Sequence, residues 1–156
     1  MADSPTVTSV PDFSAAMTSG KTFQFSGRPA SCTVLFFYPK DNTPGCTTEN
    51  IAFRDLYPQF SAAGAEIYGV SRDSLRSHES FKAKLALPFE LISDPDEAVC
   101  LLFNVMKMKQ MYGKTVRGIE RSTFVIDADG RLVKEWRGVK VAGHVDEVLE
   151  FVARQQ

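Results

Sequence analysis

The chain has 156 residues, of which 44% are hydrophobic and 24% are charged, which is the composition of an ordinary globular protein. Its 18 basic and 19 acidic side chains give a formal charge of -1, so charge offers no reason to expect nucleic acid or an anionic membrane as a partner. The length fits one domain, which we expect to span residues 1–156 without nucleic-acid or membrane partners.

The first part of the chain predicts one buried strand after a polar stretch. Thr22–Phe25 is a short apolar segment that fits an edge strand. Thr33–Tyr38 holds six β-forming residues without polar alternation, which is typical of a central strand buried on both faces. Pro39 ends this strand, because proline cannot donate a hydrogen bond to a sheet, and a run of turn residues follows over 40–45.

A helix and a second strand come next. Thr43 fits the N-cap and Pro44 the first helical position, which places Cys46 in the first turn. Four apolar side chains then recur at helical spacing: Phe53, Leu56, Tyr57 and Phe60. Ala65–Val70 follows as a strand, and this strand–helix–strand order predicts a parallel pair.

Helical and extended segments alternate through the middle of the chain. Ser74–Leu85 predicts a helix with Ser74 near its cap, Phe89–Ile92 a short strand, and Glu97–Phe103 a short helix. Residues 106–118 are rich in lysine and methionine. We expect a solvated basic loop here, and contact with a partner is the alternative.

The last part of the chain predicts a hairpin and a helix. Ser122–Ile126 and Leu132–Trp136 are strand segments joined through Asp129-Gly130, which indicates an antiparallel pair. An amphipathic helix follows, with its apolar face at Val145, Val148, Leu149 and Val152. The order of all the elements predicts an α/β protein of the thioredoxin-like fold, in which a mixed central sheet carries helices on both faces.

The cysteines define what chemistry is open to the chain. Cys32, Cys46 and Cys100 include no Cys-x-x-Cys pair, and an odd number at these positions matches neither a secreted disulfide framework nor a zinc site. Residues 1–5 lack the basic and apolar regions of a secretory signal, and no apolar run approaches the ~18–20 residues of a membrane span. We therefore expect a protein of the reducing cytoplasm, where each thiol is either buried filler or a reactive group.

Cys46 is the thiol that is placed to react. A cysteine acts as a nucleophile in its thiolate form, and the free N–H groups and positive dipole end of a helix N-terminus stabilise that anion. Its position after a buried strand, across a Pro/Gly loop and in a first helical turn favours a reactive Cys46. The alternative is a small buried hydrophobic residue.

The residues around Cys46 resemble a known family. The segment from Phe37 to Glu49 reads Phe-Tyr-Pro-Lys-Asp-Asn-Thr-Pro-Gly-Cys-Thr-Thr-Glu. Its P-x-x-x-T-x-x-C spacing resembles the active-site signature of the peroxiredoxins, in the wording of the bacterioferritin-comigratory-protein or peroxiredoxin Q branch. Further segments similar to this branch extend over nearly the whole chain: Val10–Phe13, Gly69–Ser74, Ile92–Pro95, Tyr112–Lys114 and Glu120–Phe124.

The resemblance implies an antioxidant enzyme, a thiol-dependent peroxidase that reduces hydrogen peroxide and organic hydroperoxides. Cys46 matches the peroxidatic cysteine, whose thiolate attacks one peroxide oxygen and becomes a sulfenic acid. Thr43 matches the threonine that accepts from the peroxide and donates toward the thiolate. Pro39 matches the proline that shapes the loop and shields the sulfur, and Arg121 matches the arginine that stabilises the thiolate and the charge developing on the leaving oxygen.

Each of these residues also has a simpler interpretation. From the residues alone, Thr43 fits a helix cap, Pro39 a strand end and Arg121 a surface position. Glu49, three residues after Cys46, is expected to pair with Arg121 or Arg54, and we leave it outside the catalytic set.

The chain departs from this branch in its second cysteine. The usual resolving positions are five residues after the peroxidatic cysteine, which is Ile51 here, and on the following helix, where this chain has Phe81-Lys82-Ala83-Lys84. Cys32 and Cys100 remain, and both fit buried structural cysteines better than a resolving thiol. We therefore expect a one-cysteine enzyme whose sulfenic acid is reduced by an external thiol: thioredoxin, glutaredoxin or a small thiol.

No cofactor or metal is expected. The chain has no Gly-rich phosphate loop, and His78 and His144 have no carboxylates at metal-ligand spacing. The branch resemblance implies a monomer. Two other functions stay open: a thioredoxin-like disulfide oxidoreductase, disfavoured by the missing Cys-x-x-Cys, and a non-catalytic thioredoxin-fold module, disfavoured by the joint presence of Thr43, Cys46 and Arg121.

Overall fold

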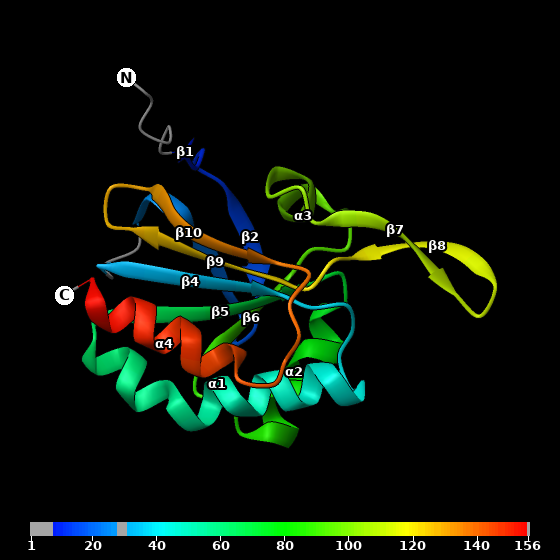
Figure 1. Ribbon diagram of the computed structural model, residues 1–156, viewed down its shortest axis with the longest axis horizontal. Coiled ribbons are helices and arrows are strands. Elements are labelled where there is room, and N and C mark those ends of the chain that lie inside the picture. Colours follow the sequence, from blue (N-terminus) through cyan, green and yellow to red (C-terminus); the bar gives the residue numbers. More distant parts are fainter. Residues whose placement is uncertain (1–7, 28–30, 156) are drawn as a thin grey trace.

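A mixed β-sheet forms the middle of the molecule (Figure 1). The computed structural model describes residues 8–27 and 31–155, so residues 1–5, where we expect no secretory signal, lie outside the described part. Eight strands are hydrogen-bonded in the order β1-β10-β9-β4-β5-β6-β2-β3. Their bounds are Thr8–Ser9 (β1), Ser14–Met17 (β2), Lys21–Gln24 (β3), Cys32–Phe37 (β4), Ala65–Ser71 (β5), Glu90–Ser93 (β6), Ser122–Asp127 (β9) and Arg131–Arg137 (β10).

Strand β4 occupies the centre of this sheet. It runs parallel to β5 and antiparallel to β9, and all six of its residues are buried, as its unbroken run of β-forming residues predicts. Strands β5 and β6 are also parallel, whereas β9 and β10 form the predicted antiparallel hairpin. Strand β3 lies at the edge of the sheet, as predicted for Thr22–Phe25.

Helices lie on both faces of the sheet (Figure 1). Val34 and Phe36 of β4 pack in one core with α1, α2 and α4, while Leu35 and Phe37 pack on the other side with α3 and the β2–β3 pair. This arrangement confirms the thioredoxin-like fold. The bounds are Phe25–Gly27 (η1, a 3-10 helix), Pro44–Ala62 (α1), Leu75–Leu85 (α2), Ala98–Leu102 (α3) and His144–Arg154 (α4).

Two helix starts follow the signals in the sequence. Thr43 is the N-cap of α1 and Pro44 is its first residue. Ser74 is the N-cap of α2, where its Oγ accepts from the backbone N–H of Ser77 at 3.2 Å. No helix of the described part is long and apolar enough to cross a membrane.

The prediction of a basic loop over residues 106–118 is wrong. These residues form a hairpin of two strands, β7 (Met106–Met111) and β8 (Lys114–Ile119), which pair only with each other and project from the body (Figure 1). Its turn is Tyr112-Gly113, with φ of 52° and 78°, as in the two-residue turns that match strand twist. Methionine and lysine alternate over residues 106–109 of β7, a period of two that the overall basic composition obscures.

Candidate active site

The first turn of α1 holds Cys46 beyond the carboxyl end of the central strand. Cys46 follows Pro44 and Gly45 in this turn, and its side chain is only 1% exposed. The helix has 19 residues, so the positive end of its dipole and its free N–H groups favour negative charge in this turn. Cys46 is thus a buried thiol in the first turn of a helix, which is the position predicted for it.

The register of the sheet brings Arg121 to the same place. Arg121 directly precedes Ser122, the first residue of β9, which pairs with Phe37 at the end of β4. Nη2 of Arg121 lies 3.5 Å from Sγ of Cys46, and Nη1 donates to Oε1 of Glu49 at 2.7 Å. Burial lowers the pKa of Arg121, but the charges of Glu49 and Cys46 outweigh it and raise that pKa above its usual value. A fixed cation therefore faces the thiol.

Glu49 holds the other side of this guanidinium. It lies one helical turn after Cys46 and is completely buried. Of its two expected partners, Glu49 pairs with Arg121, whereas Arg54 pairs with Asp55. Burial raises the pKa of Glu49 to about 7, although the charge and hydrogen bond of Arg121 act in the opposite direction. Its Oε2 has no hydrogen-bond partner among the described residues. Glu49 is therefore a more integral part of the site than its sequence position shows.

Gly45 leaves space for the guanidinium. A Cβ at this position would lie 3.1 Å from Nη2 of Arg121, closer than most real contacts of this kind. Any larger residue would press on the atom of Arg121 that approaches Cys46. The close approach of Arg121 thus explains why a residue without a side chain stands between Pro44 and Cys46.

Thr43 and Pro39 lie in the loop that leads to Cys46. The hydroxyl of Thr43 donates to the backbone carbonyl of Lys40 at 2.8 Å, so Thr43 is the N-cap of α1 by position but makes no side-chain capping bond. Because its hydrogen is engaged by Lys40, the Thr43 hydroxyl does not donate toward the Cys46 thiolate in this structure, contrary to that part of its expected role, and its oxygen is left as an acceptor. Pro39 is half-buried directly after the β4 strand and its neighbour Tyr38. Their roles toward a peroxide stay predictions.

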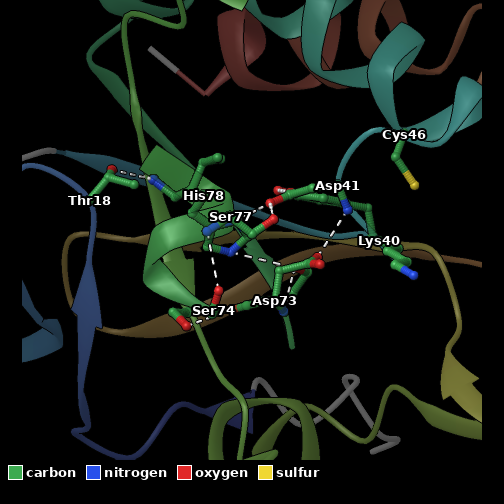
Figure 2. Close-up of polar contacts among 12 residues, drawn as sticks. Thr18, Lys40, Asp41, Cys46, Asp73, Ser74, Ser77 and His78 are labelled. Carbon is green, nitrogen blue, oxygen red and sulfur yellow. Dashed lines mark hydrogen bonds and ion pairs between the residues drawn. The ribbon is translucent and has the colours of Figure 1, made fainter. Parts of the chain in front are cut away.

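A buried polar cluster lies behind this loop (Figure 2). Oδ2 of Asp41 is 2.8 Å from Nδ1 of His78, so spacing in the sequence misses a carboxylate neighbour that is 37 residues away in the chain. Tyr38 donates to Oδ1 of the same carboxylate at 2.7 Å. Burial and the charges of Asp41 and Asp73 raise the pKa of Tyr38 well above its usual value, so this hydroxyl stays a donor.

The sheet separates Cys46 from one of the other two thiols. Cys46 and Cys32 belong to the core beneath α1, α2 and α4, whereas Cys100 belongs to the core on the opposite face. Cys32 begins β4, at the end of the strand away from Cys46. Burial, with the neighbouring Asp94 carboxylate, raises the pKa of Cys100, which disfavours its thiolate. None of these three described cysteines is in a disulfide.

Comparison with known proteins gives one consistent result. The chain matches the AhpC/TSA family over residues 7–135. It is 51% identical to peroxiredoxin Bcp of Xanthomonas campestris over 138 residues, which are 88% of this chain and 86% of that protein. A solved structure of the bacterioferritin comigratory protein of Xanthomonas campestris, described for its alkyl peroxide reduction activity, has 48% identity and a TM-score of 0.87 over 92% of this chain and 91% of that one. A PrxQ variant from Xylella fastidiosa has 41% identity and a TM-score of 0.90, covering 99% of both chains.

Proposed function

The chain belongs to the AhpC/TSA family and to its Bcp/peroxiredoxin Q branch of thiol peroxidases, and from this membership we propose that Cys46 is the residue that attacks the peroxide. One observation carries the proposal: Nη2 of Arg121 lies 3.5 Å from Sγ of Cys46, while Nη1 is fixed on buried Glu49. Membership in this family also decides between the three functions that the sequence leaves open, in favour of the peroxidase.

The reaction begins with the thiolate of Cys46. Its sulfur forms a bond to one peroxide oxygen as the O–O bond breaks, and the other oxygen takes a proton and leaves as water or an alcohol. Cys46 then carries a sulfenic acid. Arg121 stabilises the thiolate and the charge on the departing oxygen, because Glu49 holds its Nη1 in place and its guanidinium stays protonated.

Thr43 and Pro39 orient the peroxide and exclude water. The hydroxyl hydrogen of Thr43 is engaged by Lys40, so the free lone pairs of its oxygen accept from the peroxide O–H. Pro39 and the surrounding loop shield the sulfur, in agreement with the 1% exposure of Cys46. The substrates are hydrogen peroxide and organic hydroperoxides, which the alkyl peroxide reduction described for the Xanthomonas campestris relative supports.

An external thiol reduces the sulfenic acid. It displaces water to form a mixed disulfide, which a second thiol then cleaves to regenerate Cys46. The positions of the other cysteines support this, because Cys100 lies across the sheet and Cys32 lies at the far end of β4. The reductant is thioredoxin, glutaredoxin or a small thiol, and we propose that the protein acts as a monomer in the cytoplasm.

Intact-mass measurement tests both steps. One equivalent of hydrogen peroxide without reductant should add one oxygen to the parent protein, and the dimedone adduct should map to Cys46. Cys46→Ser should keep the fold by circular dichroism and lose peroxide consumption, because a serine hydroxyl is not appreciably ionised at neutral pH. Loss of two hydrogens in place of the added oxygen would show an internal disulfide, and turnover by Cys46→Ser would remove Cys46 from the reaction.

A further inference from the structure

The loop that carries Thr43 is fastened to helix α2 by buried polar contacts (Figure 2). Asp41, in the middle of this loop, is 4% exposed, whereas its neighbours Lys40 and Asn42 are exposed. Oδ2 of Asp41 accepts from Oγ of Ser77 at 2.8 Å and lies 2.8 Å from Nδ1 of His78, and both of these partners belong to α2. Asp41 is thus the anchor of a loop whose adjacent side chains face solvent.

The surroundings of His78 determine where its protons lie. Its Nε2 is 3.0 Å from the backbone carbonyl of Ile92, which can only accept, so Nε2 carries a hydrogen. Its Nδ1 lies 2.8 Å from Oδ2 of Asp41. The Asp41 side chain also accepts from Tyr38 and Ser77, so this contact belongs to a fully hydrogen-bonded cluster that is completely or nearly completely buried.

A third side chain completes the attachment from the sheet. The backbone N–H of Asp41 donates to Oδ2 of Asp73 at 2.9 Å, just after β5. Oγ of Ser71 donates to that same Asp73 oxygen at 2.5 Å. The atoms of Asp41, Asp73 and His78 that face one another lie within 4.8 Å, and each already has a hydrogen-bond partner in the protein. Hydrogen bonding within the protein therefore accounts for this cluster without a metal ion.

The anchored loop is directly connected to the reacting groups. The carbonyl of Lys40, next to Asp41 in the chain, is the acceptor that orients the Thr43 hydroxyl. Thr43 is in turn the N-cap of the helix that carries Cys46. A displacement of Asp41 would therefore move Thr43 and uncover Cys46, which is now only 1% exposed.

We propose that Asp41 and His78 are positioning residues for the peroxidase reaction. Their buried contact holds the loop 39–43 against α2, and it thereby keeps Thr43 oriented and the sulfur of Cys46 covered. Neither side chain touches the peroxide. The effect on turnover rests on the proposed function, whereas the effect on the accessibility of Cys46 does not depend on it.

The test compares two reactions of Cys46 in His78→Gln. Peroxide reduction needs the aligned loop, whereas alkylation by iodoacetamide needs only an accessible thiolate. At a temperature well below unfolding, the variant should reduce hydrogen peroxide about ten-fold more slowly but alkylate Cys46 about ten-fold faster, because local opening removes alignment and cover together. Asp41→Asn, which breaks the pair from the loop side, should shift both rates in the same directions.

Two controls separate loop release from general loss of structure. Cys32 and Cys100 are buried elsewhere, so their alkylation, followed by peptide mass spectrometry, should not change. Ser74→Ala removes the N-cap of α2 without touching Asp41, and both of its Cys46 rates should stay within about two-fold of the parent. The proposal is overturned if both Cys46 rates in His78→Gln stay at parent values, if Ser74→Ala matches that variant, or if all three cysteines alkylate faster together. Failure of the parent to reduce peroxide would instead refute the proposed function, and the alkylation result would still stand.

Discussion

Arg121 donates from Nη1 to Oε1 of Glu49 at 2.7 Å, and the carboxylate that receives this bond is completely buried. The contact leaves only one arm of the guanidinium, Nη2, to approach Cys46. A side chain with many rotamers is in this way held in one orientation before the peroxide arrives, which is what electrostatic catalysis requires.

Glu49→Gln should change how stability depends on pH. The pKa of Glu49 is raised from 4.5 to about 7 in the folded protein, so the folded state keeps this proton after the unfolded chain has lost it. Its contribution to stability is fully present below pH 4.5 and is lost as the pH rises through about 7. Glutamine does not titrate, so the variant does not lose this contribution. Its free energy of unfolding, taken relative to that of the parent, should therefore rise by about 2–3 kcal/mol from about pH 5 to pH 8. Urea unfolding at both pH values measures these free energies. The same difference between variant and parent at the two pH values would contradict the prediction.

Arg121→Lys should slow the oxidation of Cys46 while leaving the fold intact. Lysine keeps the charge but lacks the planar fork that addresses Glu49 and Cys46 together. A lost charge-assisted donor costs about 1.5–3 kcal/mol, which corresponds to a fall of roughly 10- to 100-fold in the rate. Stopped-flow peroxide reduction measures it, with Arg54→Lys as the control for the same substitution outside the site. A rate within about two-fold of the parent would exclude Arg121 from the reaction.

Gly45→Ala should separate activity from stability. The new Cβ would lie 3.1 Å from Nη2 of Arg121, so the guanidinium must shift by a few tenths of an ångström from its position beside Cys46. Alanine is a better helix former than glycine, so the melting temperature should stay equal or rise slightly. The rate of Cys46 oxidation should nevertheless fall by about three- to ten-fold, because a small misplacement of a catalytic group is costly. An unchanged rate would show that Arg121 can yield without consequence.

The double variant Cys32→Ser, Cys100→Ser should keep most of its peroxidase activity. Neither thiol is placed beside Cys46 in the folded protein, since Cys100 lies across the sheet and Cys32 begins β4 at the end away from Cys46. With dithiothreitol as donor, turnover should stay within about two-fold of the parent once any loss of melting temperature is accounted for. Activity lost with every donor and restored by returning Cys100 alone would identify Cys100 as a resolving thiol.

Much of the fold could be predicted because local patterns and long-range packing agree in it. The apolar run of β4, the Thr43-Pro44 start of α1 and the Asp129-Gly130 turn each predict the element that the structure contains. The hairpin β7–β8 is not predicted because β7 carries lysines, which are weak strand formers, and because its turn, Tyr112-Gly113, is not one of the common Asn-Gly or Asp-Gly pairs. Strand β2 has the sequence Ser-Ala-Ala-Met. Its extended structure comes from its pairing with β3 and β6 rather than from a pattern in its own sequence.

The residues of the site also fall into two groups: those that a local sequence motif reveals and those that only tertiary packing brings together. Cys46, Thr43 and Pro39 lie within one short segment, so a sequence motif can reveal them together. The approach of Arg121 depends on the pairing of β4 with β9, and the contact of Asp41 with His78 depends on the packing of α2. The burial of Glu49 is likewise a property of the assembled core, because a carboxylate on a helix is normally exposed.

The position of the sheet between Cys46 and Cys100 has a kinetic consequence. With an external thiol as the proposed reductant, an oxidised molecule waits for a collision, so its lifetime should vary inversely with the concentration of reductant around it. A shortage of reductant prolongs that wait and gives a second peroxide time to carry the sulfur to a sulfinic acid. We expect the number of turnovers before inactivation to depend on the concentration of the reducing thiol rather than on the stability of the fold.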